Sequence, residues 1–309
     1  MQKFDLIIIG GGPGGYPLAV RCARKGLKVA VVDKSTEFGG TCLNWGCIPT
    51  KALLASAKGL HFLKNAPSFG LKVDQIDFDW NSVQNRKNQI VSQLRQGIVK
   101  LLEKSGVTIF SGFARLLSNK TVQIVDSEIS LQADKIVLAV GSIPSAPAVF
   151  PSDRSVFWTS DQALQASEIP ESLLVVGGGV IGLELGQVFN EFGSKVTVVE
   201  MMPQILPGLD TATAKRLLPV FKKAGLEILT GKKVESLRKE ESSAIAVIDG
   251  VERTFAKVLI AVGRKVNLAF MQNSDVQLEL EHGFIKVDEN FSTSIPGVYA
   301  IGDAIRGPM

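Results

Sequence analysis

The chain has 309 residues, more than a single hydrophobic core usually supports, so its length predicts two domains. A hydrophobic content of 45% and 30 glycines are typical of a globular α/β protein with many tight turns. A net charge of +4, with basic pairs that are scattered and not interleaved with aromatics, argues against nucleic-acid binding. The apolar run at residues 6–9 is too short for a membrane helix or a secretory signal, so we expect no membrane anchor and a cytoplasmic location.

The first predicted element is a buried strand over residues 4–9, which leads directly into the turn GGGPGG at residues 10–15. A helix to Lys25 and a second strand over residues 28–32 follow, and Asp33 comes directly after that strand. This order is the dinucleotide-binding fingerprint, because glycines admit a pyrophosphate, the helix N-terminus offers free N–H groups, and the acid accepts from a ribose hydroxyl. A glycine-rich turn in an ordinary βα unit is the alternative.

The next segment, GGTCLNWGCIPTK at residues 39–51, carries two of the three cysteines at the start of a predicted helix. An ideal helix would hold the Cα atoms of Cys42 and Cys47 about 8.7 Å apart, whereas a disulfide needs roughly 4.4 to 6.8 Å. We therefore expect a distorted turn, caused by Pro49, which lacks an N–H group, and eased by Gly46. Lys51, four residues after Cys47, would favour the thiolate form of a sulfur.

Reversible thiol–disulfide chemistry is therefore the preferred interpretation of the cysteine pair. Metal binding is the weaker alternative, because His61 and His282 are the only histidines and neither lies near a second CxxC-like element. We therefore predict no metal site. Farther along, residues 85–104 are predicted to form an amphipathic helix without a catalytic role.

A second copy of the dinucleotide-binding fingerprint follows. It has a strand over residues 173–176, the turn GGGVIG at 177–182, a helix to about Phe192, a strand over 195–199 and then Glu200. Gly10 and Gly177, like Asp33 and Glu200, are 167 residues apart. Duplication of every feature argues against chance and predicts two dinucleotide sites. The second would bind NAD in preference to NADP, since Glu200 would repel a 2′-phosphate and no arginine follows it.

Two dinucleotides and a redox-active cysteine pair suggest a relay between a nicotinamide, a flavin and a disulfide.

Residues 243–248 and 252–261 are predicted to form an antiparallel hairpin with Asp249-Gly250 as its turn. A last strand is predicted over residues 297–301, before Asp303.

The residues resemble the pyridine nucleotide-disulfide oxidoreductases of class I. The resemblance covers essentially the whole chain, through GGGPGG, GGTCLNWGCIPTK, KIVLAVGSIP, VVGGGVIGLELG, VLIAVGRKVN and VYAIGDA. The wording LNxGCIPTK is most similar to the lipoamide branch of this family. It implies two doubly wound Rossmann-like nucleotide-binding domains, the FAD domain at residues 1–149 and 271–309 and the NAD domain inserted at 150–270.

The resemblance also implies roles for individual residues. Cys42 would be the interchange thiol that meets a dithiol substrate, and Cys47 the thiol next to the flavin, with Lys51 paired to Glu184 beside the ring. The FAD-binding positions would be Gly10, Gly12, Pro13, Gly14, Gly15, Asp33, Lys34, Gly40, Thr41, Lys51, Ala114, Gly141 and Asp303. The NAD-binding positions would be Gly177, Gly179, Val180, Ile181, Gly182, Glu200, Val234, Ala261, Val262, Gly263 and Arg264.

The implied reaction oxidises dihydrolipoamide with NAD, giving lipoamide and NADH, and serves cell redox homeostasis. The implied partner is the lipoyl domain or lipoamide of a 2-oxo acid dehydrogenase complex. Other NAD(P)H disulfide reductases, mercuric reductase and transhydrogenase are alternatives within the family. A flavin- and NAD-binding regulatory or adhesive protein without turnover is the alternative outside it, and the presence of both cysteines counts against that alternative.

The sequence departs from the family pattern at Asp33, Val140, Pro17 and Trp45, none of which removes a reacting group. The family pattern continues beyond Met309 into a dimerisation domain with a His-Glu pair. We therefore expect a fragment that lacks the C-terminal dimerisation domain and the family dimer interface, with impaired lipoamide turnover, whereas the full-length form is expected to be a homodimer.

Overall fold

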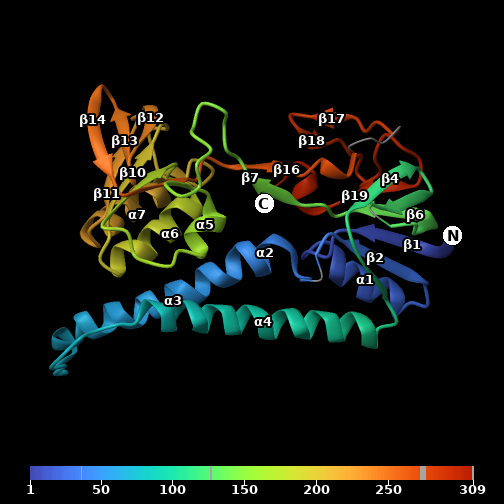
Figure 1. Cartoon of the computed structure of the whole chain (residues 1–309), viewed down its shortest axis with the longest axis horizontal. Coiled ribbons are helices and arrows are strands. Elements are labelled where there is room, and N and C mark those ends of the chain that lie inside the picture. Colours follow the sequence, from blue (N-terminus) through green and yellow to red (C-terminus); the bar gives the residue numbers. More distant parts are fainter. Residues whose placement is uncertain (36, 126, 272–275, 308–309) are drawn as a thin grey trace. The chain divides into compact units, whose positions relative to one another are not determined.

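The structure is a computed structural model, and it describes residues 1–35, 37–125, 127–271 and 276–307. The fold divides into two units that are each described separately. Unit 1 comprises Met1–Cys47, Val91–Ile143 and Arg264–Met309, and unit 2 comprises Ile48–Ile90 and Pro144–Gly263. Each unit contains a sheet of largely or wholly parallel strands with helices against it (Figure 1), which confirms the predicted α/β class.

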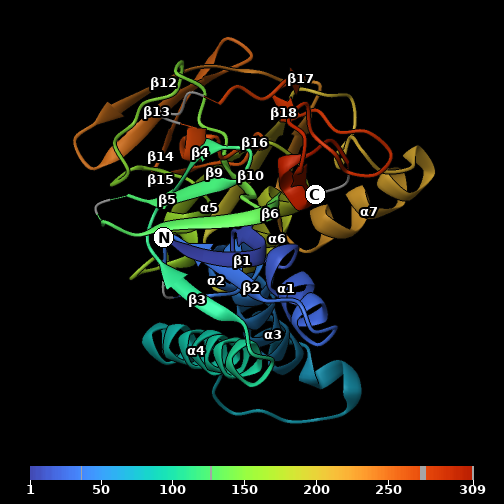
Figure 2. The same cartoon turned by 90° about the vertical axis from the view of Figure 1, so that its right-hand side faces the viewer.

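Unit 1 is built around a sheet whose central strand is β1. The strand order is β3 (Thr108–Ser111), β2 (Val29–Asp33), β1 (Gln2–Ile9), β6 (Ser130–Leu138), β5 (Thr121–Ile124) and β4 (Ala114–Ser118), and β19 (Val298–Ala300) also pairs with β6. Strands β3, β2, β1, β6 and β19 run parallel. Helix α1 (Gly15–Ala23) lies against β1 and β2, to the right of both strands in Figure 2. The carboxyl ends of β1, β2, β6 and β19 therefore meet at one edge.

Smaller elements complete unit 1. They are α2 (Gly40–Trp45), β7 (Ser142–Pro144) paired with β16 (Arg264–Val266), η2 (Ala269–Met271), the hairpin β17 (Leu280–Glu281) and β18 (Phe284–Ile285), and η3 (Gly302–Ala304). Strand β7 extends to Pro144, the first residue of the next unit 2 segment. The apolar core of unit 1 lies on both faces of its sheet, since Ile7 and Ile8 on β1 are both fully buried and belong to different clusters. Burial on both faces explains the continuous apolar run in β1.

Unit 2 contains a second, wholly parallel sheet. Its order is β11 (Glu227–Thr230), β10 (Lys195–Glu200), β9 (Ser172–Val176), β15 (Lys257–Ile260) and β8 (Phe157–Trp158). Helices α5 (Ser160–Leu164), α6 (Val180–Glu191) and α7 (Thr211–Lys223) pack against it, and the antiparallel strands β12 (Val234–Glu240), β13 (Ser243–Ile248) and β14 (Val251–Phe255) share a separate apolar cluster with it. Strands β12, β13 and β14 stand together at the left of Figure 1.

Two long helices follow the cysteine segment in the chain. They are α3 (Cys47–Lys64) and α4 (Trp80–Lys104), with η1 (Ala66–Phe69) between them. The helix predicted over residues 85–104 is confirmed, and it starts at Trp80. Residues 48–90, which the sequence analysis placed in the first domain, group with unit 2 because Trp80 Nε1 donates to the Ala166 carbonyl at 2.9 Å and α3 shares an apolar cluster with α6. The assignment of FAD and NAD to particular domains stays a prediction.

One predicted strand needs correction. Residues 252–261 form two strands and not one, because β14 ends at Phe255 and β15 begins at Lys257. Strand β15 is buried on both faces and joins the parallel sheet, whereas β14 buries only its last residue, Phe255, and pairs with β13. The predicted turn is present, since Asp249 (φ 52°) and Gly250 (φ 77°) both adopt the left-handed conformation that a tight hairpin requires.

No helix described between residues 1 and 307 combines the length and hydrophobicity needed to cross a bilayer. In the same described part of the chain, no group of three or more histidine, cysteine or acidic side chains is arranged to hold a metal ion.

Candidate functional site

The first glycine turn connects β1 to α1 in a geometry that excludes side chains. Gly10 has φ 109°, and a Cβ atom there would lie 2.2 Å from the Ala139 carbonyl oxygen. A Cβ atom on Gly15 would lie 1.9 Å from the carbonyl oxygen of Gly10, so the helix could not start so close to the strand with any larger residue. Asp33 comes at the end of β2, and its Oδ2 accepts from the Gly11 N–H group at 2.6 Å. The predicted turn and its acid therefore meet.

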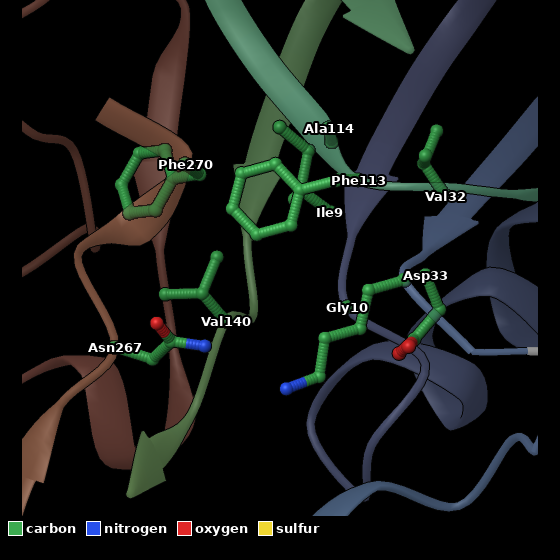
Figure 3. Close-up of a pocket in the computed structure, with 10 residues that line it drawn as sticks. Ile9, Gly10, Val32, Asp33, Phe113, Ala114, Val140, Asn267 and Phe270 are labelled. Carbon is green, nitrogen blue, oxygen red and sulfur yellow. The ribbon is translucent and has the colours of Figure 1, made fainter. Parts of the chain in front are cut away.

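A pocket opens beside this turn within unit 1 (Figure 3). It is lined by Ile9, Gly10, Val32, Asp33, Lys34, Phe113, Ala114, Val140, Asn267 and Phe270. Aromatic and aliphatic side chains form most of its wall, while the carboxylate of Asp33 lies beside Gly10 at the other side. A flat apolar base next to a sugar hydroxyl is the chemistry that such a wall and carboxylate accommodate. The residues therefore fit the adenosine end of FAD, and they include Ala114, one of the FAD-binding positions that the resemblance implied.

The second glycine turn repeats the first in unit 2. Gly177 also has φ 109°, and a Cβ atom on it would lie 2.5 Å from the Ala261 carbonyl oxygen. On Gly182, a Cβ atom would lie 2.2 Å from the Gly177 carbonyl oxygen. Glu200, at the end of β10, is buried, and its Oε2 accepts from the Gly178 N–H group at 2.7 Å. The close approach at the glycine turn and the acid beside it fit the pyrophosphate and ribose of a second dinucleotide.

The remaining predicted NAD positions divide into two groups. Ala261 directly follows β15 and donates its N–H to the Val176 carbonyl, so it lies at the carboxyl end of β9 beside the turn. Val234 is buried in the apolar cluster between the parallel sheet and β12–β14. Arg264, by contrast, lies in β16 of unit 1 and donates from Nε to Ser142 Oγ at 2.7 Å and from Nη2 to the Ser142 carbonyl at 2.7 Å.

The cysteine segment is a helix broken at Gly46. Helix α2 ends at Trp45, Gly46 has φ −148° and ψ −118°, and α3 begins at Cys47. A Cβ atom on Gly46 would lie 3.0 Å from the Thr41 carbonyl oxygen, so glycine permits the tight end of α2. Cys42 is half-buried and Cys47 is exposed. The distortion predicted from disulfide geometry is present, and the disulfide itself stays a prediction.

Lys51 and Glu184 form the ion pair that the resemblance implied, within unit 2. Lys51 Nζ donates to both carboxylate oxygens of Glu184 at 2.7 Å, which joins α3 to α6, the helix of the second glycine turn. The Lys51 side chain is 56% exposed and that of Glu184 27%. An ion pair this exposed contributes little to stability. The ion pair is present as predicted, and its role beside a flavin stays a prediction.

Asp303 belongs to a polar network that the sequence analysis did not find. The residue lies on η3, directly after β19, and its Oδ2 accepts from Ser142 Oγ at 2.8 Å. Ser142 is buried and connects Asp303 to Arg264, and its carbonyl accepts from Thr41 Oγ1 at 3.4 Å. Nothing in the sequence marks Ser142, because its partners come from segments more than 100 residues away.

A second network missed from the sequence surrounds Asn44, which is buried on α2. Its Nδ2 donates to the Glu37 carbonyl at 2.8 Å, and its Oδ1 accepts from Arg95 Nε at 2.5 Å. Arg95 Nη1 also donates to Glu37 Oε1 at 2.5 Å. The helix containing Arg95 was predicted to have no catalytic role.

Comparison with known proteins agrees with this geometry. Residues 4–309 match the family model for pyridine nucleotide-disulphide oxidoreductases. The chain is similar to the dihydrolipoyl dehydrogenase of Thermus scotoductus, with 40% identity over 100% of this chain and 68% of the relative. It is also similar to that of Acholeplasma laidlawii, with 40% identity over 98% of this chain and 90% of the relative.

Among solved structures, the chain is similar to the Cu(II) complex of the HOCl-induced flavoprotein disulfide reductase RclA from Escherichia coli. The TM-score is 0.86 and the identity 28%, over 100% of this chain and 67% of that one. Members of the matched family bind FAD and depend on NAD, so both predicted cofactors are confirmed. The chain belongs to the pyridine nucleotide-disulphide oxidoreductase family.

Proposed function

We propose that the chain carries electrons between a dithiol substrate and NAD through FAD, with Cys42 and Cys47 as the redox pair and a dihydrolipoyl group as the substrate. The observation that carries this proposal is the helix broken at Gly46 with a cysteine on each side of the break. Such a break supplies the freedom that closing and opening a disulfide between these positions requires. The two duplicated glycine turns supply binding sites for both dinucleotides.

The substrate reaction follows from the roles proposed for the cysteines. One thiolate of the dihydrolipoyl group attacks Cys42 Sγ, which breaks the Cys42–Cys47 bond and leaves Cys47 as the thiolate. The second substrate thiolate then displaces Cys42, which forms the lipoyl disulfide and leaves Cys42 as a thiolate. Cys42 takes up one of the two protons that the substrate thiols released, and the other proton goes to solvent. The substrate has lost two electrons and two protons, and the cysteine pair has gained the electrons. FAD, when bound, would supply the two-electron chemistry that links reoxidation of the cysteine pair to reduction of NAD.

Other residues are proposed to bind and orient the two cofactors. We propose that Asp33 and Glu200 accept from ribose hydroxyls of FAD and NAD, since each terminates a strand and already accepts an N–H group of its glycine turn. Lys51, held by Glu184, would place a positive charge one helical turn after Cys47. Asp303, held by Ser142, would accept from the ribityl chain of FAD.

The proposed nicotinamide cofactor is NAD and not NADP. Both oxygens of Glu200 accept backbone N–H groups, from Gly178 at 2.7 Å and Met202 at 2.8 Å, which fixes the carboxylate at the turn. A fixed carboxylate would repel a 2′-phosphate, whereas it can accept from a 2′-hydroxyl. The proposed partner is the lipoyl domain of a 2-oxo acid dehydrogenase complex. The dihydrolipoyl group in the names of the 40% identical relatives supports a partner that bears a lipoyl group.

An anaerobic titration of the FAD-loaded protein with NADH tests the redox pair. The expected result is reduction with the appearance of two thiols per chain that react with a thiol reagent. Cys22→Ser is the matched control, because Cys22 lies on α1 outside the broken helix, and this variant should still gain two thiols. Cys42→Ser and Cys47→Ser should gain none. A wild-type chain that gains no thiols would show that the cysteines are not the redox pair.

A second measurement tests the substrate. Dihydrolipoamide and reduced glutathione are offered separately as reductants of the FAD-loaded protein, and flavin absorbance is followed. The expected result is faster bleaching by dihydrolipoamide, because its second thiol lies in the same molecule and completes the exchange without a further encounter. Faster bleaching by glutathione would assign the chain to a different reductase of the family.

A further inference from the structure

The short helix α2, which carries Cys42, has an unusual need for external support. It contains only six residues, from Gly40 to Trp45, and an isolated helix of that length does not persist in water. Gly46 then interrupts the chain before Cys47. The position of Cys42 relative to Cys47 therefore depends on the contacts that hold α2, and not on helix continuity.

Those contacts anchor both ends of α2 within unit 1. Before the helix, Gly39 donates its N–H to the Gly11 carbonyl in the first glycine turn at 2.9 Å. Near the other end, the buried side chain of Asn44 is held between Glu37 and Arg95. Asn44 lies two residues after Cys42 and three before Cys47. Its anchor is therefore the one closest to the break.

The two hydrogen bonds of Asn44 allow only one orientation of its side-chain amide. The amide oxygen accepts from the cationic Arg95 Nε, and the amide nitrogen donates to the Glu37 carbonyl, so a flipped amide would place a donor against a donor and an acceptor against an acceptor. Arg95 reaches Asn44 and the Glu37 carboxylate at the same time through two nitrogens of its planar fork. Lysine, with a single ammonium group, cannot reproduce that pair of contacts in the same geometry.

We propose that Arg95 is a positioning residue for the redox cysteines. With Glu37 it holds Asn44, and through Asn44 it holds α2 where Cys42 can meet Cys47. The effect is a higher effective concentration of one thiol for the other, which favours the closed disulfide. This inference rests on the proposed function only in taking Cys42 and Cys47 as the redox pair.

The equilibrium between the cysteine pair and glutathione tests the inference. Oxidised glutathione takes two electrons and two protons from the thiols of Cys42 and Cys47, which gives one intrachain disulfide and two reduced glutathione molecules. We expect Arg95→Met to lower the equilibrium constant of this exchange about tenfold, which corresponds to a reduction potential about 30 mV less negative. Arg95→Lys should give an intermediate value, because it keeps the charge and one contact.

Lys100→Met is the matched control. Lys100 is another cation on α4 and lines the same surface groove as Arg95 and Glu37. Its removal tests for a general effect of charge loss on this helix, and the equilibrium constant should stay within about twofold of the wild type. Each variant is measured under conditions where circular dichroism shows it to be folded, so that loss of structure is not counted as a loss of effective concentration.

A double-mutant cycle separates positioning through Asn44 from any independent effect of Arg95. If the two side chains act as a unit, Asn44→Leu combined with Arg95→Met should lower the constant no more than Asn44→Leu alone. Should Arg95→Met fail to fold, Glu37→Gln replaces it, since it removes the anionic partner of Arg95 and keeps the main-chain carbonyl that Asn44 uses. That variant should lower the constant about threefold.

The outcomes distinguish this inference from the proposed function. A wild-type chain that forms no Cys42–Cys47 disulfide at any glutathione ratio contradicts the redox pair itself. A wild-type chain that forms the disulfide, together with an Arg95→Met or Glu37→Gln variant of unchanged equilibrium constant, overturns the positioning role and leaves the redox pair intact.

Discussion

At the scale of single residues, Lys87 shows how unit 2 accommodates a charge in its interior. The side chain is buried, and Nζ donates to the Leu164 carbonyl at 2.6 Å, at the end of α5. Burial lowers the pKa of Lys87 from 10.5 to about 8, because removal from water penalises the ammonium form. The contact satisfies one of the carbonyl groups that a helix leaves unpaired at its C-terminus.

This pKa predicts a pH dependence of stability with a definite sign. Between about pH 8 and pH 10.5 the unfolded chain binds a proton at Lys87 that the folded chain has released, so the free energy of unfolding rises with pH in that window. The total gain is on the order of 3 kcal/mol at most. Urea unfolding of the wild type and of Lys87→Met at pH 7 and pH 10 measures this gain. From pH 7 to pH 10, the free energy of unfolding of the wild type should rise relative to that of the variant. A difference that is independent of pH would show that Lys87 titrates normally when folded.

The residues of the site differ in how far the sequence revealed them. Asp33 and Glu200 could be predicted, because an acid that follows the second strand of a βαβ unit must lie at the carboxyl end of the sheet beside the glycine turn. Ser142 and Arg95 could not, because their partners are distant in sequence, and only folding brings a serine or arginine to them. Arg264 followed the predicted NAD turn in sequence but contacts Ser142 in unit 1.

At the scale of elements, helix α6 has two glycines with different surroundings. Gly182 lies over the turn, where a Cβ atom would be 2.2 Å from the Gly177 carbonyl oxygen and 2.9 Å from Val175 Cγ1. Gly186 lies one turn later, where the nearest atom to a Cβ would be 3.4 Å away, an ordinary contact. Only the first glycine is required by the close approach of helix and strand.

Alanine at the two positions should therefore have opposite effects. Gly182→Ala must push the helix from the turn, and we expect it to cost roughly 1 to 3 kcal/mol of unfolding free energy and to weaken NADH binding. Gly186→Ala should gain up to about 1 kcal/mol, because alanine has the higher helix propensity, and should keep NADH binding. Urea unfolding and NADH fluorescence titration of both variants measure these effects. Equal behaviour of the two variants would contradict the steric argument.

The strands and helices predicted around both glycine turns are present, with bounds that differ by one or two residues. The hairpin prediction was wrong at its second strand because only Ala256 separates β14 from the apolar run of β15. A one-residue connection carries no turn signal of its own. Pairing of β15 with β9 and β8 in the parallel sheet separates the two strands.

At the scale of the whole molecule, the chain passes from unit 1 to unit 2 and back twice. The sequence analysis placed an inserted domain at residues 150–270, and the second segment of unit 2 covers residues 144–263. The last strand returns to the first sheet, since Val298 pairs with Ile136. The sequence analysis did not predict that residues 48–90 belong to unit 2, because α3 and α4 are continuous helices that each belong partly to both units.

Each cofactor should protect its own unit from hydrogen exchange. A ligand at a hundredfold excess over its dissociation constant stabilises the native state by about 2.7 kcal/mol, so amides that exchange only by unfolding of the unit that binds it slow down. We expect FAD to protect β1, β2 and β6, and NAD to protect β9, β10 and β15. Mass spectrometry of exchange, with each cofactor alone, measures this. Protection of β9 and β10 by FAD and of β1 and β2 by NAD would reverse the assigned sites.

The sequence by itself determined the two glycine turns, their terminal acids, the cysteine pair and the family, because each depends on local backbone requirements or on a short spacing. Only the tertiary structure decided that Arg95 and Glu37 hold Asn44, that Ser142 connects Asp303 to Arg264, and that residues 48–90 join unit 2. These arrangements depend on the meeting of side chains with buried polar groups far away in the chain, and a buried polar group takes whichever partner the fold brings within reach.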